Sequence, residues 1–329
     1  MAAAELIELW RGGMLESTHR GHVVVCDDTG QVVARWGDPD RAIFPRSSCK
    51  MLQALPLVES GAADGFGLSE RHLALSCASH SGAPLHRDMV EQWLATLDLS
   101  EGDLRCGAHM PYDPEAQRQL IRAGQQPCQC HNNCSGKHSG FLTMNKHLKG
   151  GSEYVEADHP VQKAVRAAYE EVTGEDSPGY GIDGCSAPNF ATSVGGLARA
   201  MARFAGATET GARGTAMVKL RSAMMAHPEM VAGETRACTE LMRAMGTGAA
   251  IKTGAEAVFV AILPGQKLGM ALKIVDGGTR AAEAAIVALL ARAGVLDPAH
   301  PAARKRLGDP IRNWRGIDCG EVRLAAGFV

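Results

Sequence analysis

The sequence predicts an α/β fold in which strands from both chain ends form one antiparallel sheet and the middle of the chain is mostly helical. Apolar, valine-rich runs bounded by turn residues lie near both ends of the 329-residue chain. Capped segments with helical apolar spacing fill the stretch between them. The alternating strand-helix order of a Rossmann domain is missing. We therefore expect a single unit over residues 1–329, with a sheet lobe from 1–40 and 250–329 and a helical lobe from 41–249.

The N-terminal end predicts three strands. Apolar runs cover residues 5–10, 19–28 and 31–38. The turn residues Asp28, Thr29 and Gly30 separate the last two runs, which is typical of a hairpin. We expect these strands to pair antiparallel.

The C-terminal end predicts a second hairpin and a final helix. The apolar runs 255–263 and 268–275 flank the turn segment Pro264-Gly265-Gln266-Lys267. An alanine-rich run with helical spacing follows at residues 280–296, and Gly294 lies near its end. Strands from the two ends of the chain are expected to share one sheet.

Helix signals dominate the middle of the chain. Asp158 is expected to cap a helix that begins with Pro160 and ends at Gly174. Further segments with helical spacing are residues 86–97, 189–206, 215–230 and 233–246. These helices are expected to pack on the sheet.

Composition excludes several classes of protein. Apolar residues make up 45% and charged residues 21%, as in folded globular proteins. The formal net charge is −2 and no basic block is present, which argues against a nucleic-acid partner. No apolar run reaches the roughly 18 residues of a membrane span, and the first residues do not resemble a signal peptide, so we expect a cytoplasmic protein. In that compartment its ten cysteines would be thiols or metal ligands rather than disulfides.

The stretch "RSSCK" carries an S-x-x-K spacing. On a helix, Ser47 and Lys50 lie on the same face, so the amine can reach the hydroxyl. A desolvated lysine can then act as the base that activates a serine nucleophile. A helix-capping serine beside a solvated lysine is an equally simple reading of this motif alone.

A second motif, Lys252-Thr253-Gly254, precedes the predicted strand 255–263. Together with S-x-x-K it is a combination found in serine β-lactamases and penicillin-binding proteins. In that architecture the strand lies beside the serine. Ser79, in the polar run "CASHSG", is a candidate for a second active-site serine, although a plain loop explains the run as well. The alternative for the K-T-G segment is a surface lysine before a turn glycine.

A dense cluster, "CQCHNNCSGKHSG", predicts either a metal site or buried thiols at a helix start. Its candidate ligands are Cys128, Cys130, His131, Cys134, Lys137 and His138. The spacing fits no standard zinc finger or ribbon, so further ligands would have to come from distant single cysteines such as Cys185 or Cys238. In "GIDGCSAPNF", Asp183 could bind a substrate ammonium group or cap a helix.

Taken together, these motifs resemble, in order along the chain, those of the rhizobial-type L-asparaginases, also called class 3 or the asparaginase II family. The segments are "RSSCK", "CASHSG", "HNNCSGKHSG", "GIDGCSAPNF", "VAGETRACTELM" and "IKTGAEAVF". The resemblance covers essentially the whole chain. It implies a fold like that of serine β-lactamases and penicillin-binding proteins, a homodimer, and hydrolysis of L-asparagine to L-aspartate and ammonia through a β-aspartyl-serine intermediate.

The resemblance also implies roles for individual residues. Two Ser-Lys tandems would act in catalysis, Ser47 with Lys50 and Ser79 with Lys252. A zinc ion would be bound by Cys134, Lys137 and Cys238 together with a water, and the substrate by Arg46, His138 and Asp183. No role is implied for Cys128, Cys130 or His131.

Two other functions are compatible with parts of the sequence. A serine β-lactamase or transpeptidase-like hydrolase would explain S-x-x-K with K-T-G but not the thiol-rich cluster. A non-catalytic binding protein stabilised by zinc would explain the cluster without turnover.

Overall fold

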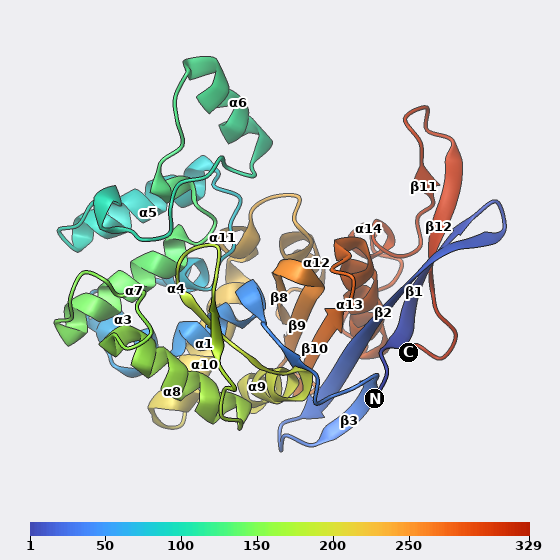
Figure 1. Ribbon diagram of the computed structural model, residues 1–329, viewed down its shortest axis with the longest axis horizontal. Helices are drawn as coiled ribbons and strands as arrows, with labels where there is room; N and C mark the ends of the chain where they lie inside the picture. Colours follow the sequence, from blue (N-terminus) through green and yellow to red (C-terminus); the bar gives the residue numbers. More distant parts are fainter. The chain divides into compact units, whose positions relative to one another are not determined.

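The computed structural model describes residues 1–329 and consists of two compact units (Figure 1). The sheet unit comprises Met1–Ser48, Thr192–Gly206 and Glu240–Val329, and the helical unit comprises Cys49–Ala191 and Ala207–Thr239. The sheet unit therefore also includes residues 41–48, 192–206 and 240–249, which the sequence places in the helical lobe.

The sheet unit is built on an eight-stranded antiparallel sheet. Its strands are β1 (Ala4–Arg11), β2 (Met14–Asp27), β3 (Val32–Trp36), β8 (Ala250–Gly254), β9 (Val258–Leu263), β10 (Leu268–Ile274), β11 (Ile311–Arg312) and β12 (Asp318–Leu324). They follow the order β11-β12-β1-β2-β10-β9-β8, and β3 pairs with β2. The predicted α/β class, with a sheet formed from both chain ends, is confirmed.

Both predicted hairpins are present. β2 pairs with β3 across the Asp28–Gly30 turn, and β9 pairs with β10 in a register that joins Leu263 to Leu268. The K-T-G segment, however, lies in a separate strand, β8, rather than at the start of β9. A short helical turn, η4 (Ala255–Ala257), reverses the chain so that β8 pairs antiparallel with β9.

Helices complete the sheet unit. They are α9 (Val194–Gly206), α13 (Thr279–Arg292), α14 (Pro301–Arg304) and most of α12 (Ala237–Met245), and the small strands β4 (Ala42–Ile43) and β7 (Thr192–Ser193) pair with each other. α9 and α13 pack against the central strands. Every residue of β9 is buried, which explains its uninterrupted apolar sequence. Packing of apolar α9 on β2, β9 and β10 also explains why this mid-chain helix belongs to the sheet unit.

The helical unit holds most of the remaining helices. They are α1 (Lys50–Gln53), α2 (Leu55–Glu59), α3 (Ala62–Gly65), α4 (Glu70–Ser76), α5 (Pro84–Thr96), α6 (Pro114–Ala123), α7 (Ser135–Leu148), α8 (Pro160–Thr173), α10 (Gly211–Ala226) and α11 (Pro228–Ala232). Short turns η2 (Glu101–Asp103) and η3 (Gln129–His131) and the strand pair β5 (Tyr180–Ile182) and β6 (Pro188–Phe190) lie between them. Trp93 joins α5 to α7, because its buried indole donates to Thr143 Oγ1 over 2.9 Å. No helix is both long and apolar enough to span a bilayer.

Several helix boundaries differ from the predicted ones, and two of them have a clear local cause. His159, not Asp158, caps α8, because its side chain accepts a hydrogen bond from the backbone of Val161. The predicted helix 215–230 is divided into α10 and α11 at His227, the residue before Pro228, where proline disfavours helical geometry.

Candidate active site

The segment that carries Ser47 folds as a 3₁₀ turn, η1 (Arg46–Cys49), leading directly into α1. Arg46 has φ +53°, which turns the chain sharply at the start of this segment. Ser48 Oγ donates to Pro45 O over 2.7 Å and is buried, so Ser48 has a structural partner. Ser47 is half-buried. Lys50, the first residue of α1, follows Ser47 by three residues, but its amine bonds to Ala78, Ser79 and Cys134 and makes no hydrogen bond to Ser47.

The end of β8 lies beside this turn. A Cβ on Gly254 would lie 2.5 Å from Pro45 O and 3.0 Å from Ser48 N, so only glycine allows the strand to come this close. Lys252 is fully buried on the same strand, and its Nζ donates to Thr253 O over 2.9 Å. The K-T-G motif therefore lies next to the turn that contains Ser47, the arrangement expected from the sequence.

Lys50 is buried in the helical unit, at the N-terminus of α1. Its Nζ lies 3.0 Å from Ser79 Oγ and 3.0 Å from Cys134 Sγ, and it also donates to Ala78 O. The Ser79 backbone is held by a bond from its N–H to Val231 O over 2.9 Å. A single lysine amine thus connects the second candidate serine with the cysteine cluster.

The cysteine cluster is centred on three side chains. Lys137 Nζ lies 3.0 Å from Cys185 Sγ. The neighbouring Cys134 lowers the pKa of Cys185 against the effect of burial, and the Lys137 cation lowers it further. Burial opposes a charge on Lys137, but the Cys185 and Cys134 sulfurs outweigh it and raise the lysine pKa. Cys185, together with burial, raises the pKa of Cys134. These directions favour a thiolate on Cys185, an ammonium on Lys137 and a neutral thiol on Cys134.

Cys185, one of the two distant cysteines that the sequence offered as further ligands, lies in the cluster, although the resemblance implied Cys238. It lies 48 residues from Lys137, in the loop between β5 and β6, and no spacing rule connects two such positions. Cys238, the residue implied as the third ligand, is buried at the start of α12. It does not form a group of three mutually close metal-binding side chains with Cys134 and Cys185.

His138 and Asp183 flank the cluster. His138 Nδ1 lies 2.9 Å from the Tyr154 hydroxyl, which also accepts from Arg105 N. His138 Nε2 is buried and makes no hydrogen bond. Burial lowers the pKa of this histidine, which favours the neutral imidazole. Its buried Nε2 is suited to form a hydrogen bond with a ligand.

Asp183 lies half-buried in the same loop as Cys185. Its backbone accepts from Ser186 N over 2.9 Å, and its own N–H donates to Ala187 O over 3.0 Å. This tight turn holds the carboxylate close enough to Lys137 to help raise the pKa of that amine. It does not cap a helix, the alternative that the sequence left open.

The candidate residues are distributed over both units. Arg46, Ser47 and Lys252 belong to the sheet unit, and Lys50, Ser79, Cys134, Lys137, His138, Asp183, Cys185 and Cys238 belong to the helical unit. Cys128, Cys130 and His131 lie at the turn η3, where Cys128 Sγ is 3.2 Å from His131 Nδ1.

A family model described as L-asparaginase II matches residues 7–324. No curated protein sequence gives a match. Among solved structures, the chain is similar to that of Mglu in its native form, with TM-score 0.50 and 12% identity over 89% of this chain and 69% of that one. A β-lactamase from Mycobacterium bovis aligns with TM-score 0.37 and 14% identity over 84% and 95% of the two chains. An octameric penicillin-binding protein homologue from Pyrococcus abyssi aligns with TM-score 0.35 and 13% identity over 90% and 80%.

Proposed function

The chain belongs to the L-asparaginase II family, a family of hydrolases, and from this premise we propose that it hydrolyses L-asparagine to L-aspartate and ammonia. The observation that carries the proposal is the buried Lys50 amine, which lies 3.0 Å from Ser79 Oγ. A desolvated amine beside a hydroxyl is an arrangement that can activate a serine for amide hydrolysis.

Ser47 is the proposed nucleophile. Lys50 takes its proton, and Ser47 Oγ forms a bond to the side-chain amide carbon of asparagine. Collapse of the tetrahedral species breaks the carbon–nitrogen bond and leaves a β-aspartyl ester on Ser47. Water then cleaves this ester and returns the proton to the serine. Backbone N–H groups near the nucleophile are the proposed oxyanion donors, each typically worth about 3–4 kcal/mol.

Ser79 is proposed to transfer a proton to the departing ammonia. Its contact with Lys50 supports a path from the base to the leaving group. Lys252, buried at the end of β8, is the proposed second lysine of this relay. This assignment gives each serine a lysine partner, Ser47 with Lys50 and Ser79 with Lys252.

Three residues are proposed to bind the substrate. Arg46 would pair with the α-carboxylate, since a guanidinium can bind both oxygens at once. Asp183 would pair with the α-ammonium group. The buried Nε2 of His138, which has no hydrogen-bond partner in the protein, would donate to a substrate oxygen.

A zinc ion is proposed close to these groups. The buried donors Cys134, Lys137 and Cys185 would fit it once Cys134 and Lys137 have lost their protons, because thiolates are good zinc ligands and a fourth position remains for water. The geometry favours Cys185 for the place that the sequence assigned to Cys238. When bound, zinc would act as a Lewis acid and hold the β5–β6 loop on α7. Lys137 must lose its proton to bind, so metal affinity should rise with pH.

Ammonia release from asparagine tests the proposed function. Ser47→Ala should abolish turnover while leaving the unfolding temperature unchanged, because the half-buried hydroxyl has a chemical rather than a packing role. Ser152→Ala, at an exposed serine, is the control and should keep full activity. An active Ser47→Ala variant would contradict the assignment. Nitrocefin in the same assay distinguishes a β-lactamase, which would cleave it.

We also propose that the enzyme acts in the cytoplasm as a homodimer. All ten cysteines are free thiols, and such a set persists best in a reducing compartment. Light scattering should give twice the mass of one chain.

A further inference from the structure

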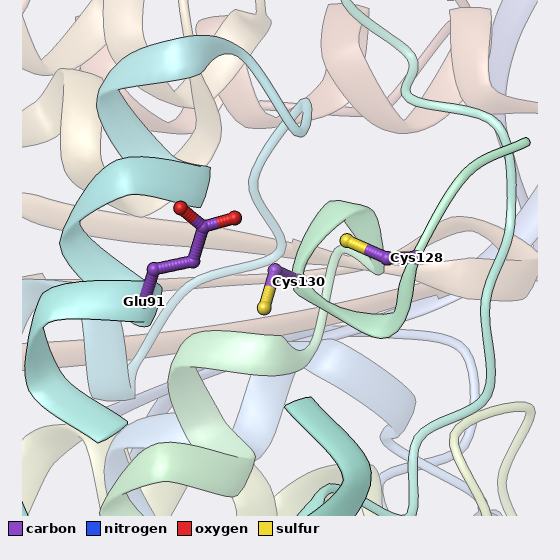
Figure 2. Close-up of side chains that lie close together, drawn as sticks. All are labelled: Glu91, Cys128 and Cys130. Atoms are coloured by element: carbon purple, nitrogen blue, oxygen red, sulfur yellow. The ribbon is translucent and has the colours of Figure 1, made fainter. Parts of the chain in front are cut away.

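Three side chains that have no part in the proposed reaction come together at the surface of the helical unit. Glu91 on α5, and Cys128 and Cys130 at η3, place their ligand atoms within 4.8 Å of one another (Figure 2). Glu91 is exposed, Cys128 half-buried and Cys130 buried, so the group is accessible from solvent on one side.

This donor set has the chemistry of a zinc site. Cysteine sulfur and carboxylate oxygen are common zinc ligands, and three protein ligands leave a fourth position for water. Zn–S bonds of about 2.3 Å in a tetrahedron place donors a little under 4 Å apart, so the present group needs only small side-chain movements. We propose that Glu91, Cys128 and Cys130 bind a thiophilic divalent metal such as Zn²⁺, at a site separate from Cys134, Lys137 and Cys185.

The η3 turn holds the two sulfurs ready for this role. Gln129 N donates to Glu101 Oε1 over 2.7 Å, and Cys128 N donates to His131 Nδ1 over 3.1 Å. Cys130 O accepts from Ser135 Oγ over 3.0 Å, which ties the turn to α7. Because the backbone on both sides is fixed, metal binding requires little ordering.

Charge at the group also favours a cation. Glu91 places a carboxylate beside the two sulfurs, and Glu101 lies next to the turn, where it accepts from Gln129 N. The nearest ion-pair partner of Glu91 is Arg87, at 3.7 Å, a partly exposed contact of little strength. A divalent metal would neutralise the carboxylate and both sulfurs together.

A rival use of the same two sulfurs is a redox pair that forms a disulfide. The Glu91 carboxylate favours the metal site over the redox pair. In a metal site Glu91 would be a ligand, whereas beside a redox pair its negative charge would only hinder ionisation of the second thiol. A bound metal would join α5 to η3, immediately before the helix that carries Cys134 and Lys137.

Metal content of the full-length protein tests the proposal. After equilibration with Zn²⁺ and desalting, Cys128→Ser and Cys130→Ser should each carry one zinc fewer per chain than the parent protein. Cys319→Ser, at another half-buried cysteine, is the control and should lose none. Cys134→Ser should retain the zinc of the Glu91 group, which separates this site from the proposed catalytic one. Unchanged zinc content in both Cys128→Ser and Cys130→Ser would overturn the proposal.

Alkylation of the parent protein gives a second test that does not depend on variants folding. Iodoacetamide should modify Cys128 much more slowly with Zn²⁺ than after chelation, as read by peptide mass spectrometry. Glu91→Gln, a change at an exposed position, should weaken this protection by at least about ten-fold. Even the loss of a group that only contacts a metal ligand typically lowers metal affinity by about this factor. Equal labelling with and without Zn²⁺, or a disulfide joining Cys128 to Cys130 in metal-treated protein, would refute the site.

Discussion

At the scale of single residues, variants of Lys50 test whether its buried amine acts as a general base or contributes only a positive charge. Lys50→Met should lower kcat about 10²–10⁴-fold, the usual contribution of general acid–base catalysis. Lys50→Arg should be equally inactive, because guanidinium keeps its proton at all working pH values. The measurement is ammonia release, with circular dichroism as the check on folding. If the arginine variant recovered activity, a positive charge alone would be sufficient and Lys50 would not be the base.

The third ligand of the proposed zinc site can be identified with a pair of variants. Cys185→Ala should remove zinc from the catalytic cluster, because Cys185 Sγ lies 3.0 Å from Lys137 Nζ. Cys238→Ala, at the buried cysteine that the resemblance implied, is the matched comparison and should keep the metal. The zinc content per chain is measured for both variants in a Cys128→Ser background, so that the proposed Glu91 site does not contribute. If only the Cys238 variant lost zinc, the third ligand would be Cys238, as expected from the sequence.

The residues of the site could be predicted only in part, for a physical reason. The spacing of Ser47 and Lys50 within one turn could be predicted, because local helical geometry depends on nearby residues. The contact of Lys50 with Ser79 and Cys134 could not, since it depends on how separate helices pack. Cys185 reaches Lys137 from a loop for the same reason.

At the scale of elements, the packing of α7 against α4 can be tested at one glycine. A Cβ on Gly136 would lie 2.5 Å from both Cγ and the carbonyl oxygen of Leu75. Gly136→Ala should therefore destabilise the protein by about 1–3 kcal/mol, as overpacking usually does. It should also weaken zinc binding, because Gly136 lies between Cys134 and Lys137.

A second glycine provides the control. Gly65 is also helical, and a Cβ added there would have no atom within 4 Å, so Gly65→Ala should be neutral or stabilise by up to about 1 kcal/mol. Urea unfolding of both variants gives the comparison. Similar stability of the two would show that α4 and α7 can separate without cost.

Elements were predictable where one local signal dominated. The two hairpins have turn residues between apolar runs, and both form. The predicted helix 189–206 begins late, at Val194, because the preceding residues pair as β6 and β7. The strands β11 and β12 were not predicted, since β12 has no fully buried residue and therefore no apolar pattern.

At the scale of the whole molecule, the sheet depends on both ends of the chain. β1 pairs with β12 and β2 pairs with β10, so the sheet unit is complete only when distant segments meet. The expectation of a sheet from both termini came from apolar runs at each end. The inclusion of α9 could not be predicted in the same way, because its apolar face fits a sheet or another helix equally well.

Buried histidines in both units make acid sensitivity a property of the whole molecule. Burial lowers the pKa of His22 in the sheet unit and of His72, His80 and His86 in the helical unit. His80 is the clearest case. Its Nε2 lies 3.0 Å from Ser135 Oγ, its Nδ1 accepts from Gly82 N, and its ring stacks on His86 at 4.7 Å. A second proton on His80 would break the bond from Gly82 and place a charge against His86.

The sign of the resulting pH dependence follows from proton uptake. These imidazoles bind protons near pH 6.5 when unfolded but only at lower pH when folded, so the unfolded chain takes up more protons as the pH falls. Stability should therefore be complete above about pH 6.5 and decrease below it, by up to about 1.4 kcal/mol per pH unit for His80. Urea unfolding from pH 7.5 to 5 measures the slope. His80→Gln should make it shallower, whereas His147→Gln, at an exposed histidine, should not. An identical slope in the His80 variant would mean that this residue accepts its proton in the folded state.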